Sequence, residues 1–157
     1  MWRLQAVVVL LLRAFGKGFG RPHLLEDATR RLIREAKRVE VYSLDYSSPT
    51  ESTPFQGAKV LGSALVEDRR TRTRLIDRIL FANKHNIGGM KCLGAEYGVR
   101  IETDLKTLEV TFCFDCSQVW VHGSDGSYDN GTTASYPVEI MNRILKRNGV
   151  PLPPQTH

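Results

Sequence analysis

Residues 97–122 read YGVRIETDLKTLEVTFCFDCSQVWVH, and this stretch decides the fold. Apolar and polar residues alternate through 97–102 and again through 108–112, which is the period of a strand with one buried face. A short turn at 104–106 joins these two strands, and a third strand is expected at 117–122. Connections this short favour antiparallel hairpins over crossovers. The stretch therefore predicts an antiparallel sheet in the second half of the chain.

The remaining segments add helices and two more strands around this sheet. Apolar residues recur with helical spacing in three segments, 24–37, 71–85 and 138–147. Strands are expected at 39–44 and 58–66, and the polar stretch 123–135 is expected to be a loop. The predicted order is α-β-β-α-β-β-β-α. We expect a single α+β domain in which about five antiparallel strands pack against two to three helices.

The length of the chain is that of one ordinary domain. A chain of 157 residues buries enough surface to fold without a disulfide or a metal. Apolar residues make up 41% and charged residues 25%, which argues against general disorder. We divide the chain into an apolar and basic segment with a glycine-rich break at 1–22, the domain at 23–150, and a proline-rich tail at 151–157.

The positive charge is concentrated near the N-terminus. Residues 1–38 hold nine Lys and Arg against three acidic residues, whereas residues 39–157 are close to neutral. A nucleic-acid surface spread over the fold is therefore not expected. The basic face of the first predicted helix carries Arg30, Arg31 and Arg34, which are candidate anion contacts. Peripheral contact of residues 1–38 with an anionic membrane is a further option.

The N-terminal apolar run is short. Residues 4–12 read LQAVVVLLL and would span about 13 Å as a helix. A bilayer core is about 30 Å thick, so the run does not predict a transmembrane span. Its length suits the apolar part of a signal peptide, but no small-residue cleavage site follows it. A cytoplasmic location is expected, and export is the alternative if residues 1–20 act as a signal.

The motif with the most chemical content is Cys-Phe-Asp-Cys at 113–116. Alternation through residues 108–112 and beyond would place Phe112 and Phe114 on the core side. Val119 and Val121 match an apolar face of the opposite parity. The pattern therefore changes phase near Cys116, which predicts a bulge or turn within the motif.

Three interpretations of the cysteines stay open. Cys113 and Cys116 suit partly buried small apolar residues. Together with Cys92 and a fourth ligand such as His85 or His122, they would make a zinc site, because zinc prefers four tetrahedral nitrogen and sulfur ligands. They would also make a redox pair, with Cys92 able to resolve a mixed disulfide. No cofactor is expected under the first interpretation, and zinc is the alternative.

Several short stretches together resemble a known pattern. They occupy residues 39–45 and 57–62, Cys92, and residues 97–100, 112–116 and 148–152. In this order they are similar to an uncharacterised group of small bacterial proteins with the pattern C…G-[IV]-R…C-F-x-C, over roughly residues 39–152. The resemblance implies a bacterial source and a role for Cys92 beside the pair. It implies no activity.

The functional expectation follows from these motifs. No nucleophile with a matching base, no phosphate loop and no paired carboxylates are recognised in the sequence. We therefore expect a non-enzymatic binding domain that interacts with a protein partner. The alternative is a thiol-disulfide or zinc-binding protein centred on the cysteines.

Overall fold

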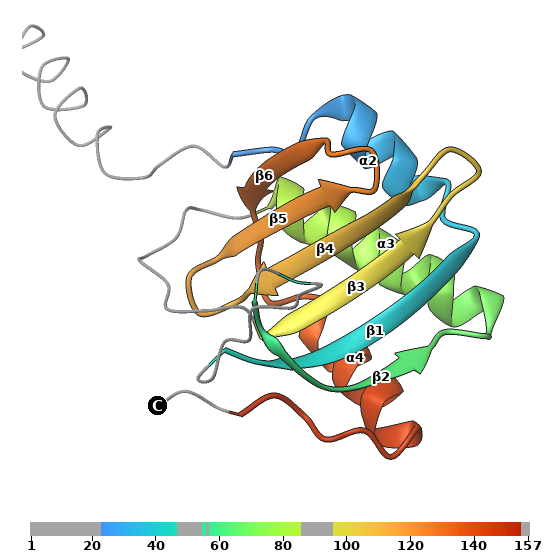
Figure 1. Ribbon diagram of the computed structural model, residues 1–157, viewed down its shortest axis with the longest axis vertical. Coiled ribbons are helices and arrows are strands. Elements are labelled where there is room, and N and C mark those ends of the chain that lie inside the picture. Colours follow the sequence, from blue (N-terminus) through green and yellow to red (C-terminus); the bar gives the residue numbers. More distant parts are fainter. Residues whose placement is uncertain (1–22, 47–54, 56, 86–95, 155–157) are drawn as a thin grey trace, which may run out of the picture.

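A six-stranded antiparallel sheet with helices packed on one face forms the domain (Figure 1). The computed structural model describes residues 23–46, 55, 57–85 and 96–154. Their elements are α2 (Asp27–Arg34), β1 (Arg38–Asp45), β2 (Lys59–Leu65), α3 (Arg69–Lys84), β3 (Tyr97–Glu102), β4 (Thr107–Cys113), β5 (Gln118–Gly123), β6 (Tyr128–Thr132) and α4 (Val138–Arg147). The expected single-domain α+β fold with an antiparallel sheet is confirmed.

The strands lie in the order β2-β1-β3-β4-β5-β6. Strands β3 to β6 form a meander, and β1 lies between β2 and β3, antiparallel to both. The chain crosses from β2 back to β3 along α3, on the same face of the sheet as α4 (Figure 1). Helix α3 begins at an aspartate cap, because the side chain of Asp68 accepts a hydrogen bond from the Thr71 amide at 2.6 Å.

The core lies between this helical layer and the sheet. A row of four valines crosses the middle of the sheet in register, from Val41 to Val99, Val110 and Val121. All four side chains are buried together with the apolar faces of α3 and α4. This arrangement explains the period-2 pattern of the sequence, because alternate residues of each strand point into the same core.

A polar network occupies the opposite face of the sheet. Glu40 accepts hydrogen bonds from the Tyr42 hydroxyl at 2.8 Å and from the Ser63 hydroxyl at 2.7 Å. One strand further on, the Arg100 guanidinium donates to Glu109 at 2.9 Å and lies 5.3 Å from the centre of the Tyr42 ring. Alternating charges on neighbouring strands therefore stabilise the side of the sheet that the helices leave uncovered.

One strand more than expected is present. Strand β6 lies inside the stretch that was predicted to be a loop, and it pairs with β5 from Gln118↔Thr132 to His122↔Tyr128. Its sequence, YDNGT, has no apolar alternation. Backbone and amide contacts hold it instead, since Thr132 donates its amide to the His23 carbonyl at 2.7 Å and Asn83 donates to the Thr132 carbonyl at 2.8 Å. The loop prediction for this stretch was wrong because it rested on polar composition, which does not exclude a strand held by backbone pairing.

Several sequence expectations fall outside the described residues. These are the N-terminal segment 1–22, with its signal and membrane alternatives, and Cys92. Within the part of the chain that the structure describes, no helix has the length and apolar character that crossing a membrane requires. After α4, Val150 and Leu152 pack against the core, so the proline-rich segment begins as a part of the domain surface.

Candidate functional site

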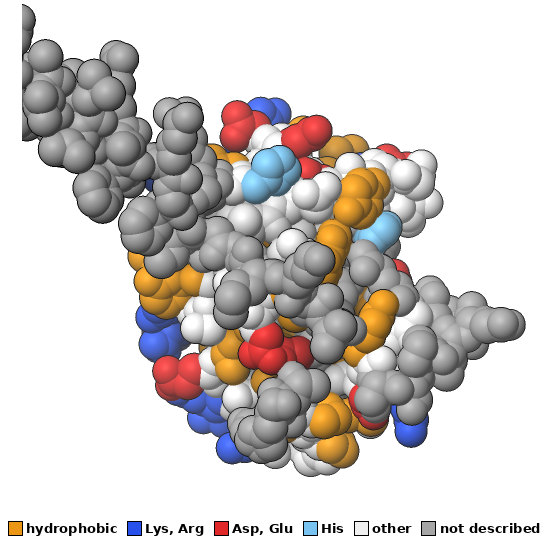
Figure 2. Space-filling view, turned by 90° about the vertical axis from the view of Figure 1, so that its left-hand side faces the viewer, with side chains coloured by type: hydrophobic (Ala, Val, Ile, Leu, Met, Phe, Trp, Pro, Cys, Tyr) orange, Lys and Arg blue, Asp and Glu red, His pale blue; other side chains and the backbone are white. Residues whose placement is uncertain are grey.

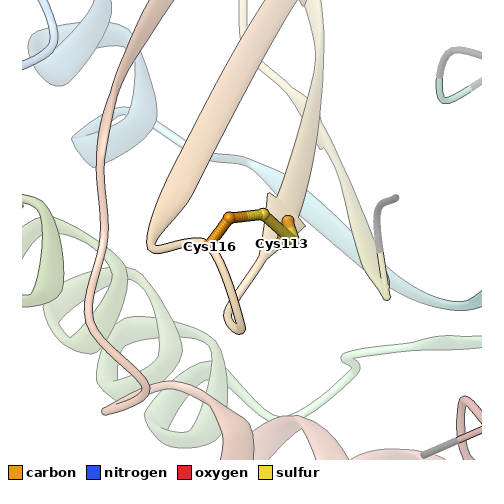
Figure 3. The surroundings of a disulfide bond; sticks show 2 residues. All are labelled: Cys113 and Cys116. Atoms are coloured by element: carbon orange, nitrogen blue, oxygen red, sulfur yellow. A yellow bond between two sulfur atoms is a disulfide. The ribbon is translucent and has the colours of Figure 1, made fainter. Parts of the chain in front are cut away.

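The Cys-Phe-Asp-Cys motif forms a cross-linked turn at one end of the sheet (Figure 3). Cys113 is the last residue of β4, and Cys116 lies in the turn that leads to β5. A disulfide joins them with their Cα atoms 5.6 Å apart, and both residues are buried. Ser117, with φ 55°, completes the turn and donates its amide to the Phe114 carbonyl at 3.1 Å. The expected phase change near Cys116 therefore corresponds to a tight turn.

The disulfide fixes how the two residues between the cysteines are presented. The Phe114 ring stacks on Phe112, with centroids 5.3 Å apart, and meets the Tyr97 ring edge-on at 5.5 Å. Asp115 is carried by the same turn, next to Glu96, which directly precedes β3. Two aromatic rings and two carboxyl groups thus lie side by side.

Glu96 and Asp115 form a carboxyl pair. Their side chains share a hydrogen bond, and the amide of Phe114 also contacts Glu96. Burial and then the negative charge of Asp115 raise the pKa of Glu96 to about 7. A hydrogen bond between two carboxyl groups forms only when one of the two holds a proton. Near neutral pH this proton is therefore gained and lost readily.

The carboxyl pair borders a pocket of about 460 Å³. The β4–β5 turn makes one wall, the first turns of α4 make the second, and the segment after α4 makes the third. The lining residues are Glu96, Tyr97, Phe114, Asp115, Ser135, Val138, Asn142, Leu152, Pro153 and Pro154. Figure 2 shows acidic side chains gathered in the middle of this side of the molecule, next to apolar ones.

Tyr97 and Asn142 tie the sheet wall of the pocket to the helix wall. The Tyr97 hydroxyl donates a hydrogen bond to the amide oxygen of Asn142 at 2.7 Å. Burial, with the charge of Glu96 second, raises the pKa of Tyr97 to about 12, so its hydroxyl stays protonated. Among the described residues that line it, the pocket has two carboxyl groups beside aromatic rings and no cationic side chain. This composition suits a cation with an apolar stem.

The predicted cysteine and histidine candidates are only partly brought together. Cys113 and Cys116 are bonded to each other, and Cys92 lies outside the described residues. His85 is the C-cap of α3, with its ring centre 4.1 Å from that of Phe81, whereas His122 lies on β5 with its ring centre 5.0 Å from that of Tyr128. Among the residues that the structure describes, no three His, Cys, Asp or Glu side chains form a group that could hold a metal ion.

The three candidate anion contacts on α2 differ in exposure. Arg30 is partly buried and lies 3.5 Å from Asp27 in an ion pair, while Arg31 and Arg34 are exposed. They make a charged outer surface, and they contribute nothing to the pocket beside the disulfide.

Sequence reasoning missed the carboxyl pair. Glu96 and Asp115 are nineteen positions apart in the sequence, and they meet because β3 and β4 pair antiparallel, with Tyr97 opposite Phe112. The signal in the sequence was weak. One acidic residue directly precedes a strand. The other lies inside a turn, two residues beyond the position that would face the first one in the hairpin. Only the register of the hairpin turns these into neighbours.

Comparisons of the chain with protein-family models, with curated proteins and with solved structures find no match.

Proposed function

We propose that this chain is a non-enzymatic binding domain whose pocket takes a primary ammonium group from a protein partner. The observation that carries the proposal is the Glu96–Asp115 pair beside the Tyr97 and Phe114 rings. A carboxylate pair supplies the charge that an ammonium requires, and aromatic faces add cation–π attraction.

The size and the position of the pocket support a side chain or chain end as its occupant. A volume of about 460 Å³ is within the range of sites for small organic groups. The site lies at the surface between the β4–β5 turn and the start of α4, and we expect a partner's lysine side chain or N-terminal amine to enter there. Apolar walls from Val138, Leu152 and Pro153 suit the methylene stem of a lysine.

The test is a titration with small probes, followed by NMR. Butylamine represents the lysine side chain, and butanol and butyrate are its neutral and anionic counterparts. We expect saturable shifts of the amide signals of Tyr97, Phe114 and Asn142 with butylamine only. The affinity should rise as the pH increases through about 7, because Glu96 loses its proton there and a lysine-type amine stays charged.

Variants show whether the carboxyl pair is responsible. The double variant Glu96→Gln, Asp115→Asn should bind butylamine roughly tenfold more weakly or worse, since it removes the charge-assisted contacts. Asp77→Asn is the control, because Asp77 is exposed on α3 and does not line this pocket. Equal binding of butylamine and butanol, or unchanged binding by the double variant, would contradict the proposal.

A thiol-disulfide role is the second candidate function. The Cys113–Cys116 bond supports it, because it spans only two intervening residues. A disulfide of this kind also persists best in an oxidising compartment, which favours the export alternative over a cytoplasmic location. Burial of both sulfurs disfavours rapid exchange. The zinc alternative requires the reduced thiols and Cys92, and metal analysis of protein purified under reducing conditions tests it.

A further inference from the structure

A second pocket, of opposite charge, lies on the other side of the start of α4. It has a volume of about 220 Å³ and is lined by Arg74, Arg78, Ser135, Tyr136, Glu139, Ile140 and Arg143. The two faces that form it belong to α3 and α4, and the segment before α4 closes one end. Three guanidinium groups and one carboxylate thus surround a small concave space.

The residues that the structure describes do not balance the charges in this pocket. Arg143 donates to Glu139 at 2.6 Å, which neutralises one arginine. Arg74 and Arg78 are one helical turn apart on α3, and neither forms an ion pair with another described residue. Like charges four residues apart destabilise a helix slightly. An anion placed between them would relieve this repulsion and gain charge-assisted hydrogen bonds.

The walls of the pocket are held in place by contacts outside it. The Ala134 amide donates to the Ala82 carbonyl at 3.2 Å, which ties the segment before α4 to α3. The Tyr136 ring meets the Phe81 ring of α3 edge-on at 5.0 Å. Ile140 is almost completely buried beneath the site. The backbone positions that carry the three arginines are therefore fixed relative to one another before a ligand binds.

We propose that this pocket binds a phosphate monoester, with the phosphate between Arg74, Arg78 and Arg143. Arginine matches the geometry of phosphate oxygens in two-point contacts and keeps its charge at all accessible pH values. The Ser135 hydroxyl is placed to donate a further hydrogen bond, and Tyr136 and Ile140 form an apolar wall for the organic part. The volume is below that of a drug-sized site, which fits a phosphate with a small substituent.

The experiment is a calorimetric and NMR titration with inorganic phosphate as the bare anion and glycerol 3-phosphate as the monoester. Binding of either probe at the pocket supports the site, and tighter binding of glycerol 3-phosphate supports the monoester. The double variant Arg74→Gln, Arg78→Gln should weaken binding roughly tenfold or more. The absence of saturable binding of both probes at millimolar concentration would overturn the proposal.

Two further variants separate a site from a general charge effect. Arg69→Gln, Arg70→Gln removes the same charge from the start of α3, outside the pocket. It should leave the affinity within about twofold of wild type, because these two arginines do not line the pocket and act on the ligand only through solvent, where salt screens them. Glu139→Gln should bind glycerol 3-phosphate more tightly, since it frees Arg143. An equal loss in both double variants, or weaker binding by Glu139→Gln, would overturn the proposal.

The Glu96→Gln, Asp115→Asn variant should bind phosphate as wild type does, so the two pockets are tested separately.

Discussion

At the residue scale, Gly98 is required by the packing of Phe55. A Cβ atom built on Gly98 would lie 2.7 to 2.9 Å from three carbon atoms of the Phe55 ring. Phe55 is buried against this point of the sheet and against Tyr42, whose ring centre is 4.7 Å away. The sheet therefore has a hollow at Gly98 into which the ring of Phe55 fits.

We predict that Gly98→Ala lowers the free energy of unfolding by about 1–3 kcal/mol, the usual cost of overpacking a core. Urea denaturation measures the effect. Phe55→Leu alone should also destabilise the protein, because it leaves part of the hollow empty. Combined with Gly98→Ala, however, it should cost less than the sum of the two changes, since the smaller side chain makes room for the new methyl group. Strict additivity of the two losses would show that the two residues do not interact in this way.

At the scale of elements, the β4–β5 turn depends on its cross-link. The disulfide closes a loop of four residues, and the loop-entropy relation gives a stabilisation of about 2 kcal/mol for such a short loop. We predict that Cys113→Ser, Cys116→Ser lowers the free energy of unfolding by about this amount, measured by urea denaturation without reductant. The same turn carries Phe114 and Asp115, so amine binding should weaken together with stability.

Reductant provides the control for this element. Adding dithiothreitol to the wild-type protein should lower its stability toward that of the double variant and leave the variant itself unchanged. An equal response of both proteins to reductant would place the effect elsewhere, for example at Cys92. Wild-type stability that does not change on reduction of the bond would show that the turn forms without it.

At the scale of the whole molecule, the raised pKa of Glu96 makes stability depend on pH. An ordinary glutamate has a pKa of 4.5, and that of Glu96 is about 7 in the folded protein. The folded state therefore holds a proton that the unfolded state has already lost between these two values. The free energy of unfolding should fall as the pH rises from about 4.5 to about 7, and then level off.

The variant Glu96→Gln isolates this contribution. Other carboxyls, such as Glu40 and Asp125, have lowered pKa values and act in the opposite direction at lower pH. Subtracting the free energy of unfolding of Glu96→Gln from that of wild type at each pH cancels their contribution, because these carboxyls are present in both proteins. We predict that the wild-type protein loses stability relative to the variant as the pH rises from 4.5 to 7. A difference that is constant over this range would contradict the raised pKa.

The sequence by itself determined the class of the fold and most of its elements. The predicted segments 97–102 and 138–147 coincide with β3 and α4, because strands and helices with one buried face leave a periodic trace in the sequence. The phase change near Cys116 was visible for the same reason. Strand β6 left no such trace, since backbone pairing and the Asn83 contacts hold it rather than an apolar face.

Tertiary structure alone decided the candidate sites. The pairing of Tyr97 with Phe112 brings Glu96 beside Asp115, and the packing of α3 and α4 on one face brings Arg74 and Arg78 to Arg143. It also joins Cys113 to Cys116 in a disulfide, because the turn places their two Cα atoms at bonding separation. Such contacts join residues far apart in the chain. They depend on strand register and helix placement, which local periodicity does not specify.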